Sequence, residues 1–214
     1  MSGLFSNSRN EESLHRSIRR ATWDDHEALH HNGLLKKFAD TTITIGEYRQ
    51  LMARFHGYYV TRDPIVAGAC DRFSTNAYSY VPRAPMFAAD LDYLGDANDC
   101  SAREAANLRH RPLQSVADLA GVAYVIEGSM LGGTLLNRNA GGLLATPAGR
   151  SYWCWCERNA AERWALTRGF IEFVGANSSD REAIIASARS TFSTLRRWMS
   201  ARSVDSPPSI EMGT

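Results

Sequence analysis

A mostly apolar run at residues 112–137 is typical of one long helix, yet it contains three glycines within six positions, Gly128, Gly132 and Gly133. Each glycine inside a helix costs about 1 kcal/mol relative to alanine. Gly128 and Gly132 are four residues apart and therefore lie on one face of the helix. We expect a kink at this point, and we expect another group to approach the backbone more closely than a side chain would permit.

Two explanations for such a close approach remain open from the spacing alone. Small residues four apart are typical of a contact with a neighbouring helix, or of a bend that improves packing. The alternative is a flat ligand that lies directly over the backbone. Ser129 would then present a small hydroxyl near the open face of the ligand, and Tyr124, one turn before Gly128, could reach a carboxylate at its edge.

The remainder of the chain predicts an all-α fold with one core. No segment shows the alternation of apolar and polar residues that is typical of a β-strand. Three-to-four spacing of apolar residues predicts helices over 11–31, 44–60, 84–94, 101–109, 152–174 and 179–201.

Local signals mark where these helices begin and end. Thr44 and Glu47 have the spacing of a capping box, Pro64 is expected to kink or end the second helix, and Pro112 suits the first turn of the long helix. The glycine-rich stretch 139–150 is expected to be irregular. We expect a flexible N-terminus at 1–10, one helical domain at 11–202 and a disordered tail at 203–214.

Composition and charge argue against several classes of function. The chain has 214 residues with 24 Lys and Arg against 23 Asp and Glu, so its net charge does not favour nucleic acid or an acidic membrane as a partner. The richest apolar run, 113–136, is interrupted by Asp118 and Glu127, so no membrane span is expected. No secretion signal is visible at the start, which predicts a cytoplasmic protein. Cys154 and Cys156 lack a second pair that would complete a zinc site, and we expect reduced thiols.

A histidine in the first predicted helix is a candidate metal ligand. Arg19 precedes His26 by seven residues, which corresponds to two turns and about 10 Å along the same face. This spacing suits a flat metal macrocycle with carboxylate arms, because the imidazole can hold the metal while the guanidinium pairs with a carboxylate. His30, one turn after His26, is the main alternative ligand.

Two segments together resemble the haem oxygenase family. Residues 18–26 read Ile-Arg-Arg-Ala-Thr-Trp-Asp-Asp-His and resemble the family's proximal helix, in which a threonine precedes the ligand histidine by four residues. Residues 124–133 read Tyr-Val-Ile-Glu-Gly-Ser-Met-Leu-Gly-Gly and resemble the distal helix of the bacterial members. A weaker match at 90–95 reads Asp-Leu-Asp-Tyr-Leu-Gly. The three segments occur in the family's order, and the resemblance extends over roughly 13–201.

The resemblance implies a single-domain helical bundle with haem held between a proximal helix and a kinked distal helix. His26 would be the proximal iron ligand, and Arg19 and Tyr124 would meet the haem propionates. Gly128, Ser129 and Gly132 would line the distal side, where the haem is attacked.

Two further residues bear on this assignment. Phe192, in the last helix, is a candidate for the haem edge. Ser129 stands where the animal enzymes have an aspartate that organises distal water, and this departure is typical of the bacterial branch.

The implied reaction consumes haem and O2 and yields biliverdin, carbon monoxide and ferrous iron. Electrons would come from a separate ferredoxin or reductase, because the chain has no glycine-rich nucleotide loop. A photoreceptor that accepts the bilin product is a further candidate partner. An acidic electron donor could dock on the basic residues of the proximal side, although an ordinary solvated face explains these residues equally well. They are Arg16, Arg19, Arg20, Lys36 and Lys37.

Two other functions remain open from the sequence. The missing distal aspartate is compatible with a carrier or sensor that binds haem or another tetrapyrrole on the same fold without turnover. The second is a helical scaffold that binds a different small molecule and no iron, in which His26 has no ligand role.

Overall fold

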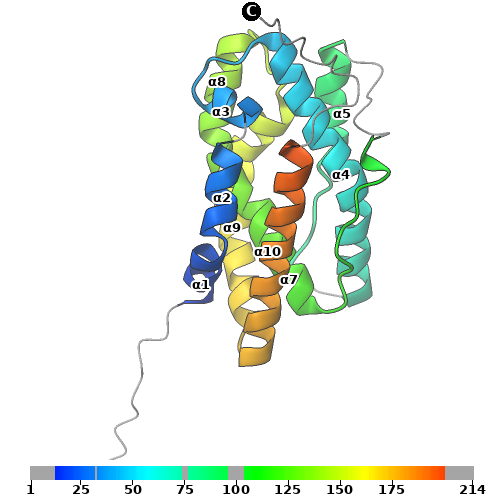
Figure 1. Ribbon diagram of the computed structural model, residues 1–214, viewed down its shortest axis with the longest axis vertical. Coiled ribbons are helices and arrows are strands. Elements are labelled where there is room, and N and C mark those ends of the chain that lie inside the picture. The colour runs from blue at the N-terminus through cyan, green and yellow to red at the C-terminus, as the bar shows by residue number, and fades with distance from the viewer. Residues whose placement is uncertain (1–12, 32, 74–76, 96–103, 201–214) are drawn as a thin grey trace, which may run out of the picture.

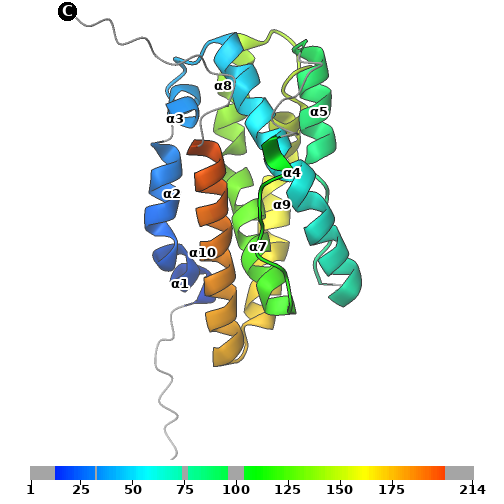
Figure 2. The ribbon, with the colours of Figure 1, turned by 45° about the vertical axis from the view of Figure 1, so that its right-hand side comes forward.

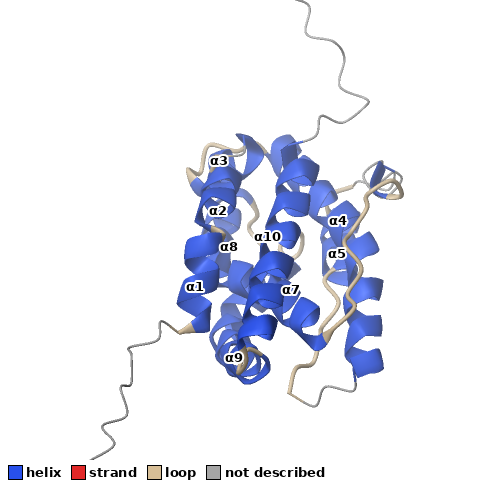
Figure 3. Cartoon of the chain, turned by 60° about the horizontal axis from the view of Figure 1, so that its bottom comes forward, coloured by secondary structure: helices blue, strands red, loops and turns tan. Residues whose placement is uncertain are grey.

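The computed structural model describes residues 13–31, 33–73, 77–95 and 104–200. Within these ranges every regular element is a helix, as the sequence predicts (Figures 1 and 3). The expected flexible N-terminus and disordered tail lie outside the described residues, as does the start of the helix expected at 101–109.

Helix α7 (Val116–Ser129) is the centre of the bundle. It packs against α10 (Ser178–Ser200), α9 (Ser151–Val174) and α4 (Ile45–Phe73), and the long helices lie side by side in Figures 1 and 2. Every residue from Ala117 to Glu127 is buried. A helix that is apolar on all sides needs neighbours on all sides, which explains why this element became the core.

The central helix and its continuation form one stretch, Val116–Leu143, that is long and apolar enough to span a membrane by length and composition alone. However, 61% of its most apolar window is buried inside the bundle. Contacts with protein therefore already cover most of the surface that a lipid would otherwise cover, as is typical of a core helix.

At the position of the expected kink, the structure has a change of helix type. After α7 the chain makes a 3-10 turn, η1 (Met130–Gly132), and then resumes as α8 (Gly133–Leu143). A short 3-10 stretch inside a longer helix commonly marks a functional hinge. Helix α7 begins at Val116, not at Pro112, because the Ser115 hydroxyl accepts a hydrogen bond from the Asp118 backbone N–H at 3.1 Å.

The single helix predicted at 11–31 is divided into α1 (Leu14–Ala21) and α2 (Trp23–His30). The Thr22 hydroxyl donates to the Ile18 carbonyl at 2.8 Å, and this back-bonding favours a bend. The two helices lie along one side of the bundle against α10 (Figure 1). The break separates the helix that carries Arg19 from the helix that carries His26.

Other boundaries depart from the sequence prediction in four places. Residues 106–109, the end of the helix predicted at 101–109, are not helical. Helix α4 does not end at Pro64 but continues to Phe73, because much of it is buried on both sides of the proline. Helix α3 (Gly33–Ala39) was not predicted, and α8 extends to Leu143, into the stretch that was expected to be irregular. Helix α5 (Ala84–Tyr93) lies where the sequence places it.

Candidate functional site

His26 lies on α2 with its side chain about half exposed, at 46%. The His26 ring packs edge-on against Phe192 of α10, with ring centroids 6.1 Å apart, and stacks on Trp23 at 5.9 Å. The structure therefore brings together His26 and Phe192, which are 166 positions apart in the sequence. Two aromatic rings restrict the orientation of the imidazole while one edge remains accessible.

The charge state of His26 suits a metal ligand. Burial and the neighbouring His30 lower the pKa of His26, and Glu27, whose Oε1 lies 3.6 Å from the His26 Nδ1, opposes them only in part. A lowered pKa keeps the imidazole neutral at pH 7, and a neutral imidazole has a lone pair to give to a metal. Glu27 faces Nδ1, so the ring nitrogen that points away from this carboxylate is Nε2, which lies 3.2 Å from the Nε2 atom of His30.

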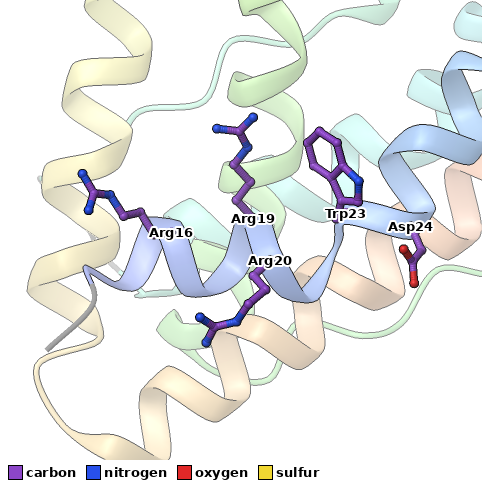
Figure 4. Close-up of a pocket in the computed structure, with 5 residues that line it drawn as sticks. All are labelled: Arg16, Arg19, Arg20, Trp23 and Asp24. Carbon is purple, nitrogen blue, oxygen red and sulfur yellow. The ribbon is translucent and has the colours of Figure 1, made fainter.

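Arg19 lies one turn before Trp23, and its guanidinium carbon is 5.3 Å from the centre of the Trp23 ring. Figure 4 shows Arg16, Arg19 and Trp23 pointing from one side of the helical segment, whereas Arg20 and Asp24 point from the other side. These five residues line an open pocket. Trp23 thus links the predicted carboxylate-binding arginine to the predicted ligand His26.

Sequence reasoning missed Trp23, although a signal was available. It lies four residues after Arg19 and three before His26, so all three occupy one stripe of the helical surface. The same stripe continues to Arg16 and His30.

The predicted basic residues have different surroundings. Lys36 forms an ion pair with Asp40, and Lys37 forms one with Glu47. Arg16, Arg19 and Arg20 line the pocket on α1.

Tyr124 lies on α7 beside the break between α1 and α2. Burial raises the pKa of Tyr124, while the charge of Arg19 and a hydrogen bond with Thr22 act in the opposite direction. The structure therefore places Tyr124 within electrostatic range of Arg19. Its ring also packs edge-on against Trp164 of α9, with centroids 5.5 Å apart.

The three glycines of the distal segment have different surroundings. A Cβ atom on Gly132 would meet no other atom within 4 Å, and Gly132 lies at the surface. A Cβ on Gly128 would be 3.4 Å from the Trp164 ring, which is an ordinary contact. A Cβ on Gly133 would lie 2.3 Å from the Cys156 Cβ. Gly133 therefore serves a helix contact, whereas Gly132 leaves open space.

Ser129 lies at the surface beside this space. Its hydroxyl donates to the Ile126 carbonyl at 2.7 Å, so the proton of this hydroxyl is already used within its own helix. The oxygen keeps free acceptor capacity. Ser129 is thus suited to accept a hydrogen bond and is poorly suited to donate one.

Glu127, immediately before the glycines, is fully buried and paired. It accepts two hydrogen bonds from Arg163 at 2.7 Å, one from Tyr78 at 2.8 Å, and lies 2.9 Å from the fully buried Arg83. Burial raises the pKa of Glu127, but the Arg163 hydrogen bonds and the charge of Arg83 outweigh burial and leave the pKa lowered.

This cluster anchors the end of α7. Arg83 also donates to the Met130 sulfur at 3.5 Å, so it joins the last turn of α7 to the first residue of η1. The sequence identifies Glu127 only as a charged interruption of the apolar run 113–136. Its partners are 36 to 49 positions away, and no local pattern could have identified them.

Comparisons with known proteins agree with this geometry. A model of the family described as Heme oxygenase matches residues 12–201, and the chain therefore belongs to the haem oxygenase family. The sequence has no significant match among curated proteins.

Solved structures show the same fold at low sequence identity. The heme oxygenase from Leptospira interrogans is 17% identical, with a TM-score of 0.70, over 88% of this chain and 99% of that chain. Heme oxygenase-1 from the cyanobacterium Synechocystis, solved in complex with heme, is 15% identical, with a TM-score of 0.66, over 88% and 91% of the two chains. At this identity the likeness establishes the fold, and the roles of individual residues depend on their own geometry.

Proposed function

We propose that this chain binds haem through His26 and opens the ring, using O2 and electrons from an external donor, to give biliverdin, carbon monoxide and ferrous iron. The observation that carries the proposal is the environment of His26, a neutral and accessible imidazole held by Phe192 and Trp23. The haem oxygenase family and fold support the reaction class.

Two helical segments support a slot for a flat ligand: the α1–α2 segment forms one wall, and α7 forms the other. Thr22 of the α1–α2 break interacts with Tyr124 of α7. His26 is one turn after Thr22, and Gly128 is one turn after Tyr124, in two helices that run the same way up the bundle (Figure 1). Beyond this contact the distal wall has no side chain at Gly132. Haem fits these residues, because one side offers a ligand and the other offers space.

Haem, when bound, supplies the redox chemistry and is itself the substrate. The chain binds and orients it. The Nε2 atom of His26 would hold the haem iron, and Glu27 lies beside the opposite ring nitrogen, 3.6 Å away. Arg19 pairs with a propionate and fixes the rotation of the ring in its slot, and Tyr124 supports the same edge. Gly128 and Gly132 keep the distal side free for O2.

The electron donor is an acidic ferredoxin or reductase in this proposal. The pocket lined by Arg16, Arg19 and Arg20 offers positive charge on the proximal side, and complementary charge accelerates association. Transfer of the bilin product to a photoreceptor is compatible with this reaction.

The test has two stages. Addition of hemin should produce a Soret band that His26→Ala alters and that His31→Ala, at the neighbouring exposed histidine, leaves unchanged. If no band depends on His26, the chain is a scaffold that binds no haem through this residue.

Addition of reductant and O2 to the hemin complex should then remove the Soret band and produce the absorption of biliverdin. Persistence of the Soret band under these conditions would support the alternative, a carrier or sensor that binds haem without turnover.

A further inference from the structure

His30 lies one turn after His26, the predicted haem ligand, and the two imidazole rings approach each other. The Nε2 atoms of the two rings are 3.2 Å apart, and the ring centroids are 4.5 Å apart. Both imidazoles lie at the surface of α2. The two Nε2 atoms therefore converge on one point that solvent can reach.

The distance between these nitrogens matches a metal chelate. Imidazole nitrogens bind Zn²⁺ at about 2.0–2.1 Å, so two of them at a tetrahedral angle are about 3.3 Å apart. Histidines four residues apart on a helix face the same way, and this spacing supplies two zinc ligands in known metal-binding helices. A cation could enter between His26 and His30 with little movement of either ring.

Proton positions support the same conclusion. The two Nε2 atoms can share a hydrogen bond only if one of them carries a proton, because two lone pairs facing each other repel. A divalent cation would accept both lone pairs at once. Both Nδ1 atoms would then carry the protons, and Glu27, 3.6 Å from the His26 Nδ1, would accept from one of them.

We propose that His26 and His30 form a two-imidazole site for a divalent first-row transition cation, represented by Zn²⁺, with water in the remaining positions. The part of the chain that the structure describes has no group of three or more potential metal-binding side chains. A site with two protein ligands is open and exchangeable, unlike a closed structural zinc site.

This site makes the cation and haem compete, since both require the Nε2 atom of His26. The competition rests on the proposed function, whereas the cation site stands without it. The same link gives His30 a role after ring opening. The released ferrous ion belongs to this class of cation, and His30 is placed to give it a second imidazole as it leaves the opened ring.

Isothermal titration of the haem-free, tag-free chain with Zn²⁺ tests the site. We expect one Zn²⁺ per chain, and an affinity lowered by about tenfold or more, or 1.4 kcal/mol, in both His26→Ala and His30→Ala. His31→Ala is the matched control and should bind as the unaltered chain does. Far-ultraviolet circular dichroism confirms folding, and His30→Gln repeats the test with a side chain of similar reach. Equal Zn²⁺ affinity in the unaltered chain, His26→Ala and His30→Ala would overturn the proposal.

A second titration separates this proposal from the proposed function. In the unaltered chain Zn²⁺ should weaken hemin binding, measured by the Soret band, whereas His30→Ala should keep the band and lose the sensitivity to Zn²⁺. Zn²⁺ binding through both histidines without a Soret band would contradict the haem function alone. A Soret band that depends on His26, without Zn²⁺ binding, would contradict the cation site alone.

Discussion

The distal segment, residues 127–133, has two faces, and each contains a glycine that serves a different purpose. Its packed face (Glu127, Met130 and Gly133) lies against α9 and the buried Arg83, and a Cβ on Gly133 would lie 2.3 Å from Cys156. Its open face (Ser129 and Gly132) has no atom near a Cβ built on Gly132. Two adjacent glycines therefore have opposite surroundings, a helix contact at Gly133 and open space at Gly132. The packed face fixes the wall, and the open face leaves room beside it.

The largest effect should come from removing the charge that holds the packed face. Glu127→Ala leaves Arg83 and Arg163 without their shared carboxylate in a buried site, and loss of one partner from a buried ion pair costs about 3–5 kcal/mol. Urea unfolding should show this loss of stability. Glu127→Gln keeps the volume and some hydrogen bonds, so it should cost less. A loss below about 1 kcal/mol in Glu127→Ala, the range of a surface ion pair, would show that the cluster does not anchor the helix.

A smaller loss should follow from overfilling the packed face. Gly133→Ala places a methyl group against the Cys156 Cβ, and overpacking of a core costs about 1–3 kcal/mol. The measurement is again the free energy of unfolding in urea. Cys156→Gly, introduced in the same chain, should recover part of the loss, because it removes the atom that clashes. Because Cys156→Gly itself places a glycine inside a helix, its single variant completes the comparison, and strictly additive costs would place the strain elsewhere.

Acid should weaken the packed face through Glu127. The pKa of Glu127 is lower in the folded chain than in the unfolded chain, so its contribution to stability is fully present above the unfolded value of about 4.3. That contribution is lost as the pH falls through the lower folded pKa. Urea unfolding at a series of pH values should show this loss in the unaltered chain and a smaller slope in Glu127→Gln. Identical slopes would mean that other carboxyl groups dominate acid unfolding.

How much of the site the sequence could predict depends on the range of each interaction. The capping box of α4 is local, and it is present as expected, with the Thr44 N–H donating to Glu47 at 2.9 Å and the Glu47 N–H to Thr44 at 3.2 Å. The distal kink also follows from neighbouring glycines. The break at Thr22 was missed, because threonine occurs within helices and its back-bonding hydroxyl gives no distinct pattern.

Long-range partners could not be found in the same way. Phe192 was placed near the site only through the family resemblance, and the structure supports that placement by its contact with His26. Arg83 and Arg163 were not found at all, because any arginine could pair with a buried Glu127. A helical pattern predicts which face of a helix is buried, but the identity of the neighbour depends on how the helices pack in three dimensions.

The smallest effect on stability, and the sharpest contrast, belongs to the open face. Gly132→Ala meets no other atom within 4 Å and removes the conformational freedom of a helical glycine, so it should stabilise the chain by about 0.5–1 kcal/mol. Urea unfolding beside Gly133→Ala should then give opposite signs at adjacent positions. Destabilisation at both positions would remove the distinction between the two faces.

A larger side chain at the same position connects the open face to function. Gly132→Leu should fold normally and should keep the Soret band that depends on His26, because the proposed iron ligand, His26, lies on α2 and not on the distal segment. It should slow conversion of haem to biliverdin, because the leucine occupies the space beside the face of the haem that lies opposite His26. Conversion rate and hemin affinity are measured together. A general loss of folding would lower both, whereas obstruction of the open face should lower the conversion rate alone. Unchanged conversion in Gly132→Leu would show that the open face does not border the reacting side of the haem.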